Sequence, residues 1–150
     1  MKSFKSYITE AVKSPNWYKS LYSKQKGIFY RGEDPKTRKS GAGLGALGTG
    51  IYLTWERDTA LAYANLSRAG TMAGVVVEFK VPANLKLADS KGEDFLSVLE
   101  KMGITGYSAD PMFARALTFE LKKMGYDGVV SDDKIEGLVI FEPRKVKKIK

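Results

Sequence analysis

Cysteine and histidine are both absent from the 150-residue sequence. Without them the chain cannot form disulfides, a thiolate nucleophile or an imidazole base, and it lacks the usual zinc ligands. Any catalysis must therefore use carboxylates, hydroxyl groups, tyrosines and cationic side chains, and no metal site is predicted. Long apolar runs are missing too. None approaches the roughly 20 residues needed to cross a bilayer, so we expect no contact with a membrane.

Acidic residues are in the minority. The chain has 25 Lys and Arg against 17 Asp and Glu, a formal net charge of +8, which favours an anionic partner such as nucleic acid, a phosphorylated ligand or an acidic protein. Much of the excess lies in the last seven residues, at Arg144, Lys145, Lys147, Lys148 and Lys150. We interpret this segment as a terminal strand with its lysines in solvent and with Val146 and Ile149 facing inward. Contact with nucleic acid is the alternative.

The length and a hydrophobic content of 43% fit one domain with one core. Strands are predicted at 27–31, 51–55, 74–81, 129–130, 138–141 and 146–149. Helices are predicted near 17–23, 95–102 and 113–124, and a further helix is expected to begin at a cap on Asp58 or Thr59. The strands are separated by unequal insertions without regular alternation, so the predicted fold class is α+β.

Residues 43–48 read Gly-Leu-Gly-Ala-Leu-Gly, which satisfies the G-x-G-x-x-G pattern of dinucleotide-binding folds. That pattern needs a strand immediately before it and a helix immediately after it. Here charged residues precede it and a predicted strand follows. We therefore reject a dinucleotide fold and interpret the stretch 33–50 as a polar, glycine-rich loop bordering a cleft, since glycine permits close backbone approach.

Three separated pieces of the chain carry side chains suited to chemistry. They are Tyr30-Arg31-Gly32, then Gly50-Ile51-Tyr52-Leu53-Thr54 followed by Ala60-Leu61-Ala62-Tyr63-Ala64, and finally Glu136 ahead of the predicted strand 138–141. Each alone is most often structural. In this order, together with Gly-Tyr-Asp-Gly at 125–128 and Val-Ile-Phe-Glu-Pro at 139–143, they resemble the ADP-ribosyltransferase superfamily, in particular its small phage and polyvalent-protein branch. The resemblance covers about residues 27–149.

The resemblance implies an ADP-ribosyltransferase-like split β-sandwich with flanking helices around an NAD cleft. In this interpretation residues 11–26 form an N-terminal helical segment and residues 27–150 form the catalytic domain. The implied activity is mono-ADP-ribosyl transfer with NAD as substrate. We expect a monomer.

The chemistry explains why these residue types belong together. Breaking the bond between nicotinamide and ribose produces an oxocarbenium-like transition state, so a negative charge is needed beside the ribose. The resemblance assigns this charge to Glu136, which would bond the ribose 2′-hydroxyl and help activate the acceptor. Arg31 offers a planar fork of donors for the phosphates and ribose of NAD. Thr54 takes the position whose hydroxyl orients the glutamate in arginine-modifying members.

Aromatic side chains complete the predicted substrate site. Tyr63 is placed to stack on the nicotinamide, and Tyr52 is a second candidate for that contact. The full set predicted to bind NAD is Tyr30, Arg31, Gly32, Tyr52, Thr54 and Tyr63.

The chain departs from the family pattern two residues before the catalytic position. Arginine-modifying members carry Glu there and many others carry Gln, whereas this chain has Lys134, so arginine is not assigned as the acceptor. Other carboxylates compete with Glu136. Glu142 lies on the same closing segment but marks the far end of the predicted strand, away from the cleft, and Asp132 and Asp133 are outside candidates.

The first ten residues, Met-Lys-Ser-Phe-Lys-Ser-Tyr-Ile-Thr-Glu, would by composition be a frayed basic terminus. They nevertheless resemble the capsid-targeting sequence of T4-like phages, which the phage prohead protease removes after Ile/Leu-x-Glu. The resemblance predicts cleavage after Glu10, leaving Ala11 as the new terminus. It implies that the protein is packaged in the capsid interior of the virion and enters the host cytoplasm after injection.

The acceptor stays open at this point. A host protein is favoured, and RNA or DNA is the alternative because a basic surface would concentrate an anionic acceptor near the cleft. Two other functions compete with transfer. One is a non-catalytic internal head protein that binds packaged DNA through charge, and the other is an NAD glycohydrolase with water as acceptor.

Overall fold

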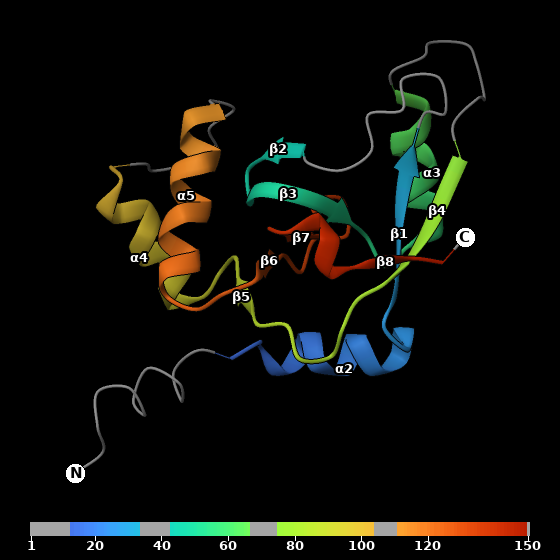
Figure 1. The fold of residues 1–150 in the computed structure, drawn as a ribbon, viewed down its shortest axis with the longest axis horizontal. Coiled ribbons are helices and arrows are strands. Elements are labelled where there is room, and N and C mark those ends of the chain that lie inside the picture. Colours follow the sequence, from blue (N-terminus) through green and yellow to red (C-terminus); the bar gives the residue numbers. More distant parts are fainter. Residues whose placement is uncertain (1–12, 34–42, 67–74, 104–110, 150) are drawn as a thin grey trace.

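The computed structural model describes residues 13–33, 43–66, 75–103 and 111–149 (Figure 1). The predicted targeting sequence 1–10 lies outside the described residues. Within them the chain forms four α-helices, α2 (Asn16–Gln25), α3 (Arg57–Leu66), α4 (Glu93–Lys101) and α5 (Pro111–Lys123), and a short 3-10 turn, η1 (Pro143–Lys145). No helix in these ranges is long and apolar enough to cross a membrane.

The strands form two sheets. The first has the order β1-β4-β8 and consists of β1 (Ile28–Glu33), β4 (Val75–Lys80) and β8 (Lys147–Lys148). The second has the order β2-β3-β7-β6-β5 and consists of β2 (Gly43–Gly45), β3 (Gly48–Leu53), β7 (Leu138–Ile140), β6 (Gly128–Val130) and β5 (Leu87–Asp89). Only β5 and β6 pair in parallel among these strands. The predicted α+β class is confirmed.

The two sheets and their helices occupy different parts of the molecule. The first sheet lies beside α3, whereas α4 and α5 lie at the opposite end of the second sheet, and α2 runs across below both (Figure 1). The second sheet is thus the centre of the molecule, and the segments that leave its strands determine where polar side chains gather.

Strand β7 is buried on both faces, which explains its continuous apolar sequence. Leu138 and Ile140 pack into one core cluster, which also holds Tyr18 of α2. Val139 between them packs into a second cluster, formed with the helices α4 and α5. Because both faces of this short strand are fixed by packing, the segments before and after it are held in defined places.

Glycine allows α3 to lie directly on β1. A Cβ atom at Gly32 would stand 2.0 Å from the carbonyl oxygen of Ala60 and 2.6 Å from the backbone nitrogen of Ala64, both on α3. Any other residue at this position would push the helix away. Gly32 therefore sets the distance between β1 and the helix that carries Tyr63.

Several sequence-based details differ from the structure. Helix α3 begins at Arg57, so Asp58 and Thr59 lie in its first turn and do not cap it. The stretch 33–50 is not a loop throughout, because residues 43–45 and 48–50 pair as an antiparallel hairpin. This hairpin confirms that no helix follows the G-x-G-x-x-G pattern. Val146 is buried as predicted, but Ile149 is half exposed, so its inward orientation was wrong.

Candidate functional site

The loop 131–137, between β6 and β7, has a shape fixed by its own hydrogen bonds. The backbone nitrogen of Ser131 donates to the carbonyl of Gly137 at 2.8 Å, and that of Gly137 donates to the carbonyl of Asp133 at 2.8 Å. Gly137 has a positive φ of 66°, and a Cβ there would lie 2.1 Å from the carbonyl oxygen of Leu53. A glycine is required at this close approach. Glu136 precedes it directly.

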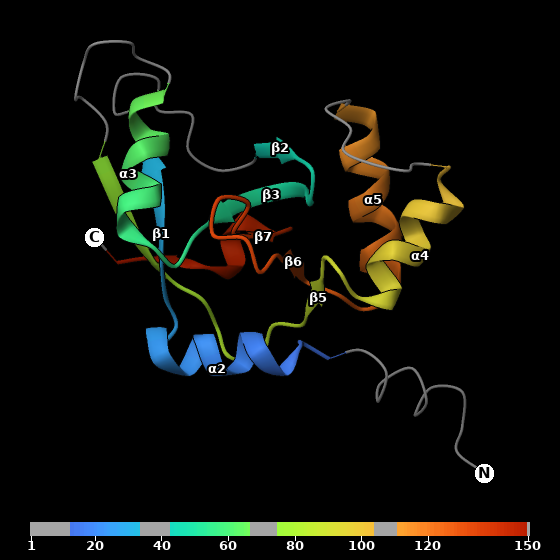
Figure 2. The same cartoon turned by 180° about the vertical axis from the view of Figure 1, so that it is seen from behind.

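Two side chains from distant parts of the chain hold successive carbonyl groups of this loop. Thr54, just after β3, is buried and donates its hydroxyl to the carbonyl of Lys134 at 3.0 Å. Tyr63, on α3, donates its hydroxyl to the carbonyl of Ile135 at 2.8 Å. Figure 2 views the molecule from the side on which α3 and this loop lie in front. The strand motif 50–54 and the helix motif 60–64, which together form the second predicted piece, thus meet at the loop that carries Glu136.

The carboxylate of Glu136 accepts a hydrogen bond from a buried serine. The hydroxyl of Ser131 donates to Oε1 of Glu136 at 3.0 Å, and the hydroxyl oxygen of Ser131 accepts the backbone N–H of Asp133 at 3.1 Å. Ser131 is 1% exposed, so its hydroxyl has little freedom to turn to solvent. Within the described residues no cationic side chain lies at ion-pair distance from Glu136. Among the described side chains, Ser131 orients this carboxylate and none neutralises it.

The direct contact to Glu136 differs from the sequence-based prediction. Thr54 was expected to orient the glutamate, but its hydroxyl bonds the backbone at Lys134. Ser131 makes the contact instead. Sequence reasoning missed Ser131, and the one signal available was a small hydroxyl residue directly after the apolar run Gly128–Val130.

The tyrosine at the site keeps an accessible ring. Tyr63 is 46% exposed although its hydroxyl is tethered. Burial raises the pKa of Tyr63, and the charges of Asp133 and Glu136 raise it further. The phenol therefore stays protonated at neutral pH and remains a donor. An accessible ring with a fixed tip is a suitable surface for stacking a planar group.

The side chain of Lys134 forms an ion pair with Glu56 and points away from Glu136. Its Nζ lies 3.0 Å from Oε2 of Glu56, whose other oxygen accepts the hydroxyl of Thr59 at 2.9 Å. The hydrogen bond from Lys134 holds the pKa of the Glu56 carboxyl below its usual value. Lys134 therefore ties the loop to the start of α3.

Arg31 lies close to the site in the sheet but does not touch Glu136 in any described contact. Its neighbour Tyr30 exchanges both backbone hydrogen bonds with Thr54, at 2.7 and 2.8 Å. The Nε of Arg31 is 3.3 Å from Oε2 of Glu33, which is ion-pair distance. The geometry is too poor for a hydrogen bond, so this buried Nε has no hydrogen-bond partner among the described residues. This N–H, which is ion-paired but not hydrogen-bonded in the described part of the chain, can donate to an anionic group.

The remaining predicted residues have structural roles in the described contacts. Tyr30 lies under the guanidinium of Arg57, 6.0 Å from its ring centroid. Tyr52 donates its hydroxyl to the carbonyl of Gly48 at 2.6 Å and accepts the backbone N–H of Leu47 at 3.2 Å. These contacts place the Tyr52 hydroxyl at the turn between β2 and β3 and away from the loop 131–137.

Two of the three competing carboxylates are held by lysines, and the third, Asp133, accepts the backbone N–H of Ile135 at 2.8 Å. Glu142 lies 2.5 Å from Nζ of Lys122, which lowers the pKa of its carboxyl. Asp132 pairs with Lys91 at 3.0 Å. In the described part of the chain no three carboxylates gather in a way that could hold a metal ion. Glu136 is therefore the carboxylate around which Thr54, Tyr63 and Ser131 are arranged.

Comparison of the chain with family models, with curated proteins and with solved structures gives no match. The functional argument therefore rests on the motifs and on this geometry.

Proposed function

We propose that the protein is a mono-ADP-ribosyltransferase that cleaves NAD and transfers ADP-ribose to a host macromolecule. The observation that carries the proposal is the convergence of Thr54 and Tyr63 on the loop of Glu136. Thr54 and Tyr63 come from the strand and helix motifs of the second predicted piece, and Glu136 is the third. The two-sheet α+β architecture is compatible with an ADP-ribosyltransferase-like split β-sandwich, which we propose as the fold.

In this proposal Glu136 stabilises the positive charge that develops at the anomeric carbon. The bond between nicotinamide and ribose breaks, and its electron pair leaves with nicotinamide. A nucleophile of the acceptor then bonds to the anomeric carbon and gives its proton to the carboxylate. Ser131 orients that carboxylate through the 3.0 Å hydrogen bond. A fixed, un-neutralised carboxylate suits this task because its field acts on the transition state without reorganisation.

The other residues would bind and orient NAD. Tyr63 presents a ring beside Glu136 on which nicotinamide can stack. Arg31 offers a buried donor for the phosphates or ribose. Tyr30, Gly32 and Thr54 would support this site mainly by placing β1, α3 and the loop. The acceptor we favour is a host protein, with RNA or DNA as the alternative.

The test is incubation of the full-length protein with radiolabelled NAD and host lysate, followed by separate protease and nuclease digestion. We expect label on a macromolecule, release of free nicotinamide and loss of both in Glu136→Gln. Label removed by protease identifies a protein acceptor, and label removed by nuclease identifies a nucleic acid. Rapid NAD loss without label would indicate a glycohydrolase, and absence of both label and nicotinamide would overturn the proposal.

We also propose that the protein is packaged in a phage head, based on the sequence of residues 1–10. Mass spectrometry of purified virions should find a chain that begins at Ala11. Finding no chain would contradict the packaging proposal, finding the full-length chain alone would contradict cleavage after Glu10, and both results would leave the enzymatic proposal unaffected.

A further inference from the structure

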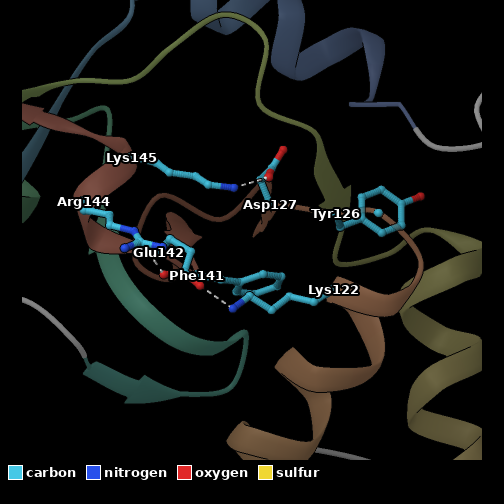
Figure 3. Close-up of a pocket in the computed structure, with 8 residues that line it drawn as sticks. Lys122, Tyr126, Asp127, Phe141, Glu142, Arg144 and Lys145 are labelled. Carbon is cyan, nitrogen blue, oxygen red and sulfur yellow. Dashed lines mark hydrogen bonds and ion pairs between the residues drawn. The ribbon is translucent and has the colours of Figure 1, made fainter.

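A second polar region lies at the opposite end of β7 from the candidate site. It is an open pocket of about 330 Å³, with three cations and two carboxylates in its lining, Lys122, Arg144, Lys145, Asp127 and Glu142. Figure 3 shows Lys122 of α5 reaching Glu142, and Lys145 of η1 reaching Asp127. The two carboxylates contact all three cations, because Glu142 also lies 3.9 Å from Arg144, and three cations against two carboxylates leave the lining with a positive excess.

The outward face of α5 leads to this pocket. Its exposed side chains recur every three or four residues and so form one stripe, made of Met112, Arg115, Ala116, Phe119, Lys122 and Lys123. Phe119 is 62% exposed and Met112 is 73% exposed. The Nζ of Lys123 lies 5.1 Å from the ring centroid of Phe119. Large apolar side chains lined up with cations on a solvent-exposed face indicate an interaction surface.

The cations continue beyond the pocket into β8. The Arg144 side chain at the rim is 86% exposed. Lys147 is exposed and stands directly opposite Lys80 in the pairing of β4 with β8. The ammonium of Lys80 donates to the carbonyl of Lys26 at 2.6 Å, so Lys147 is the lysine of this pair that can meet an anion. The stripe on α5, the pocket rim and these lysines are together called the basic face.

We propose that the basic face binds single-stranded nucleic acid. An exposed ring in line with successive cations matches the alternation of bases and phosphates along one strand, whereas a duplex hides the faces of its bases. Phe119 would stack on a base, and Lys122, Arg144 and Lys147 would contact phosphates. A lipid surface fits less well, because the apolar side chains stand in single file between cations and do not form a broad apolar face. This inference does not depend on the proposed transfer reaction.

Titration of a short fluorescent RNA or DNA strand with the full-length protein, without NAD, tests the proposal by anisotropy. We expect saturable binding that weakens as salt rises, and weaker binding to a duplex of the same sequence. Phe119→Ala should lose roughly tenfold in affinity because one stacked base is lost. Arg144→Ala should lower the slope of affinity against salt by about one unit on logarithmic axes.

Two variants outside the basic face serve as controls. Leu96→Ala removes a half-exposed apolar side chain from α4, and Lys91→Ala removes an exposed lysine. Both should bind the strand as the wild type does. Phe119 is exposed, so its variant should keep the wild-type unfolding temperature. Absence of saturable binding, an unchanged affinity in Phe119→Ala, or tighter binding to a duplex, to anionic vesicles or to an acidic peptide would overturn the proposal. Because no NAD is present, neither result bears on the transferase test.

Discussion

Strand β7 has a glutamate near each end, and the two differ in their surroundings. Glu136 stands two residues before the strand and accepts a hydrogen bond from the buried hydroxyl of Ser131. Glu142 stands two residues after the strand and is paired with Lys122 at 2.5 Å and with Arg144 at 3.9 Å. The same residue type is thus oriented by a neutral group at one end and neutralised by cations at the other.

The difference shows which end suits the proposed chemistry. A carboxylate paired with lysine has much of its field cancelled, so it contributes little to a developing positive charge nearby. A carboxylate held by a neutral donor keeps its charge and its orientation. The first end therefore fits catalysis and the second fits a binding surface for anions.

Removing the charge of each glutamate in turn tests most directly whether the two ends of β7 differ in function. We expect Glu136→Gln to reduce nicotinamide release from NAD by on the order of 100-fold or more, because transition-state stabilisation is lost. Glu142→Gln should stay within about twofold of wild type, since its charge is already compensated. Release is measured by chromatography at saturating NAD. Comparable losses in both variants, or a larger loss in Glu142→Gln, would remove the distinction between the two ends.

The next largest effect is expected from the hydroxyl that orients Glu136. Ser131→Ala should lower kcat roughly tenfold, because a misplaced group loses much of its effect on the transition state. The KM for NAD should change little, since Ser131 is buried and does not line the substrate in this proposal. Ser97→Ala, on the exposed side of α4, is the matched control. A rise in KM with unchanged kcat would assign Ser131 to substrate binding and not to positioning.

Two substitutions of Tyr63 distinguish the role of its hydroxyl group from the role of its ring. Tyr63→Phe removes the hydrogen bond to Ile135, worth about 0.5–1.5 kcal/mol, and should lower kcat a few-fold. Tyr63→Ala should also raise the KM for NAD several-fold, since a stacking surface worth about 0.5–1.5 kcal/mol is lost. Leu61→Ala on the same helix is half exposed and should behave as wild type. Identical KM values for Tyr63→Phe and Tyr63→Ala would exclude stacking on this ring.

Much of the candidate site could be predicted from the sequence because its residues lie in short motifs. The motifs predict Thr54, Tyr63 and Glu136 as site residues, and the structure brings them to one loop. The α+β class followed from the irregular spacing of apolar runs. Strand β5 was missed because Leu87–Asp89 is short and lacks β-branched residues, and its pairing with β6 is decided by tertiary contacts.

The contacts that could not be predicted depend on the geometry of loops. Ser131 reaches Glu136 only because Gly137 and Asp133 turn the loop back on itself. Sequence spacing gives no indication of such a turn. The basic pocket likewise joins the end of α5 to η1, and nothing in either segment alone predicts that Lys122 faces Glu142. Local patterns identify elements, whereas these contacts depend on how the elements pack.

The smallest expected effect concerns the ion pair that keeps Lys134 away from Glu136. The pKa of Glu56 is lowered below its ordinary value of 4.5, first by the hydrogen bond from Lys134. A depressed carboxyl pKa adds stability above the unfolded-state value, and this stability is lost as pH falls through the folded-state value. Glu56→Gln should therefore lower the unfolding temperature slightly at neutral pH, and the difference should shrink as pH falls below about 4.5, toward the lowered folded-state pKa. Circular dichroism melts across this range measure it, with Glu100→Gln, an exposed change on α4, as control. A difference that persists or grows in acid would show that Glu56 acts through something other than its charge, and the pair would then not explain why Lys134 lies away from Glu136.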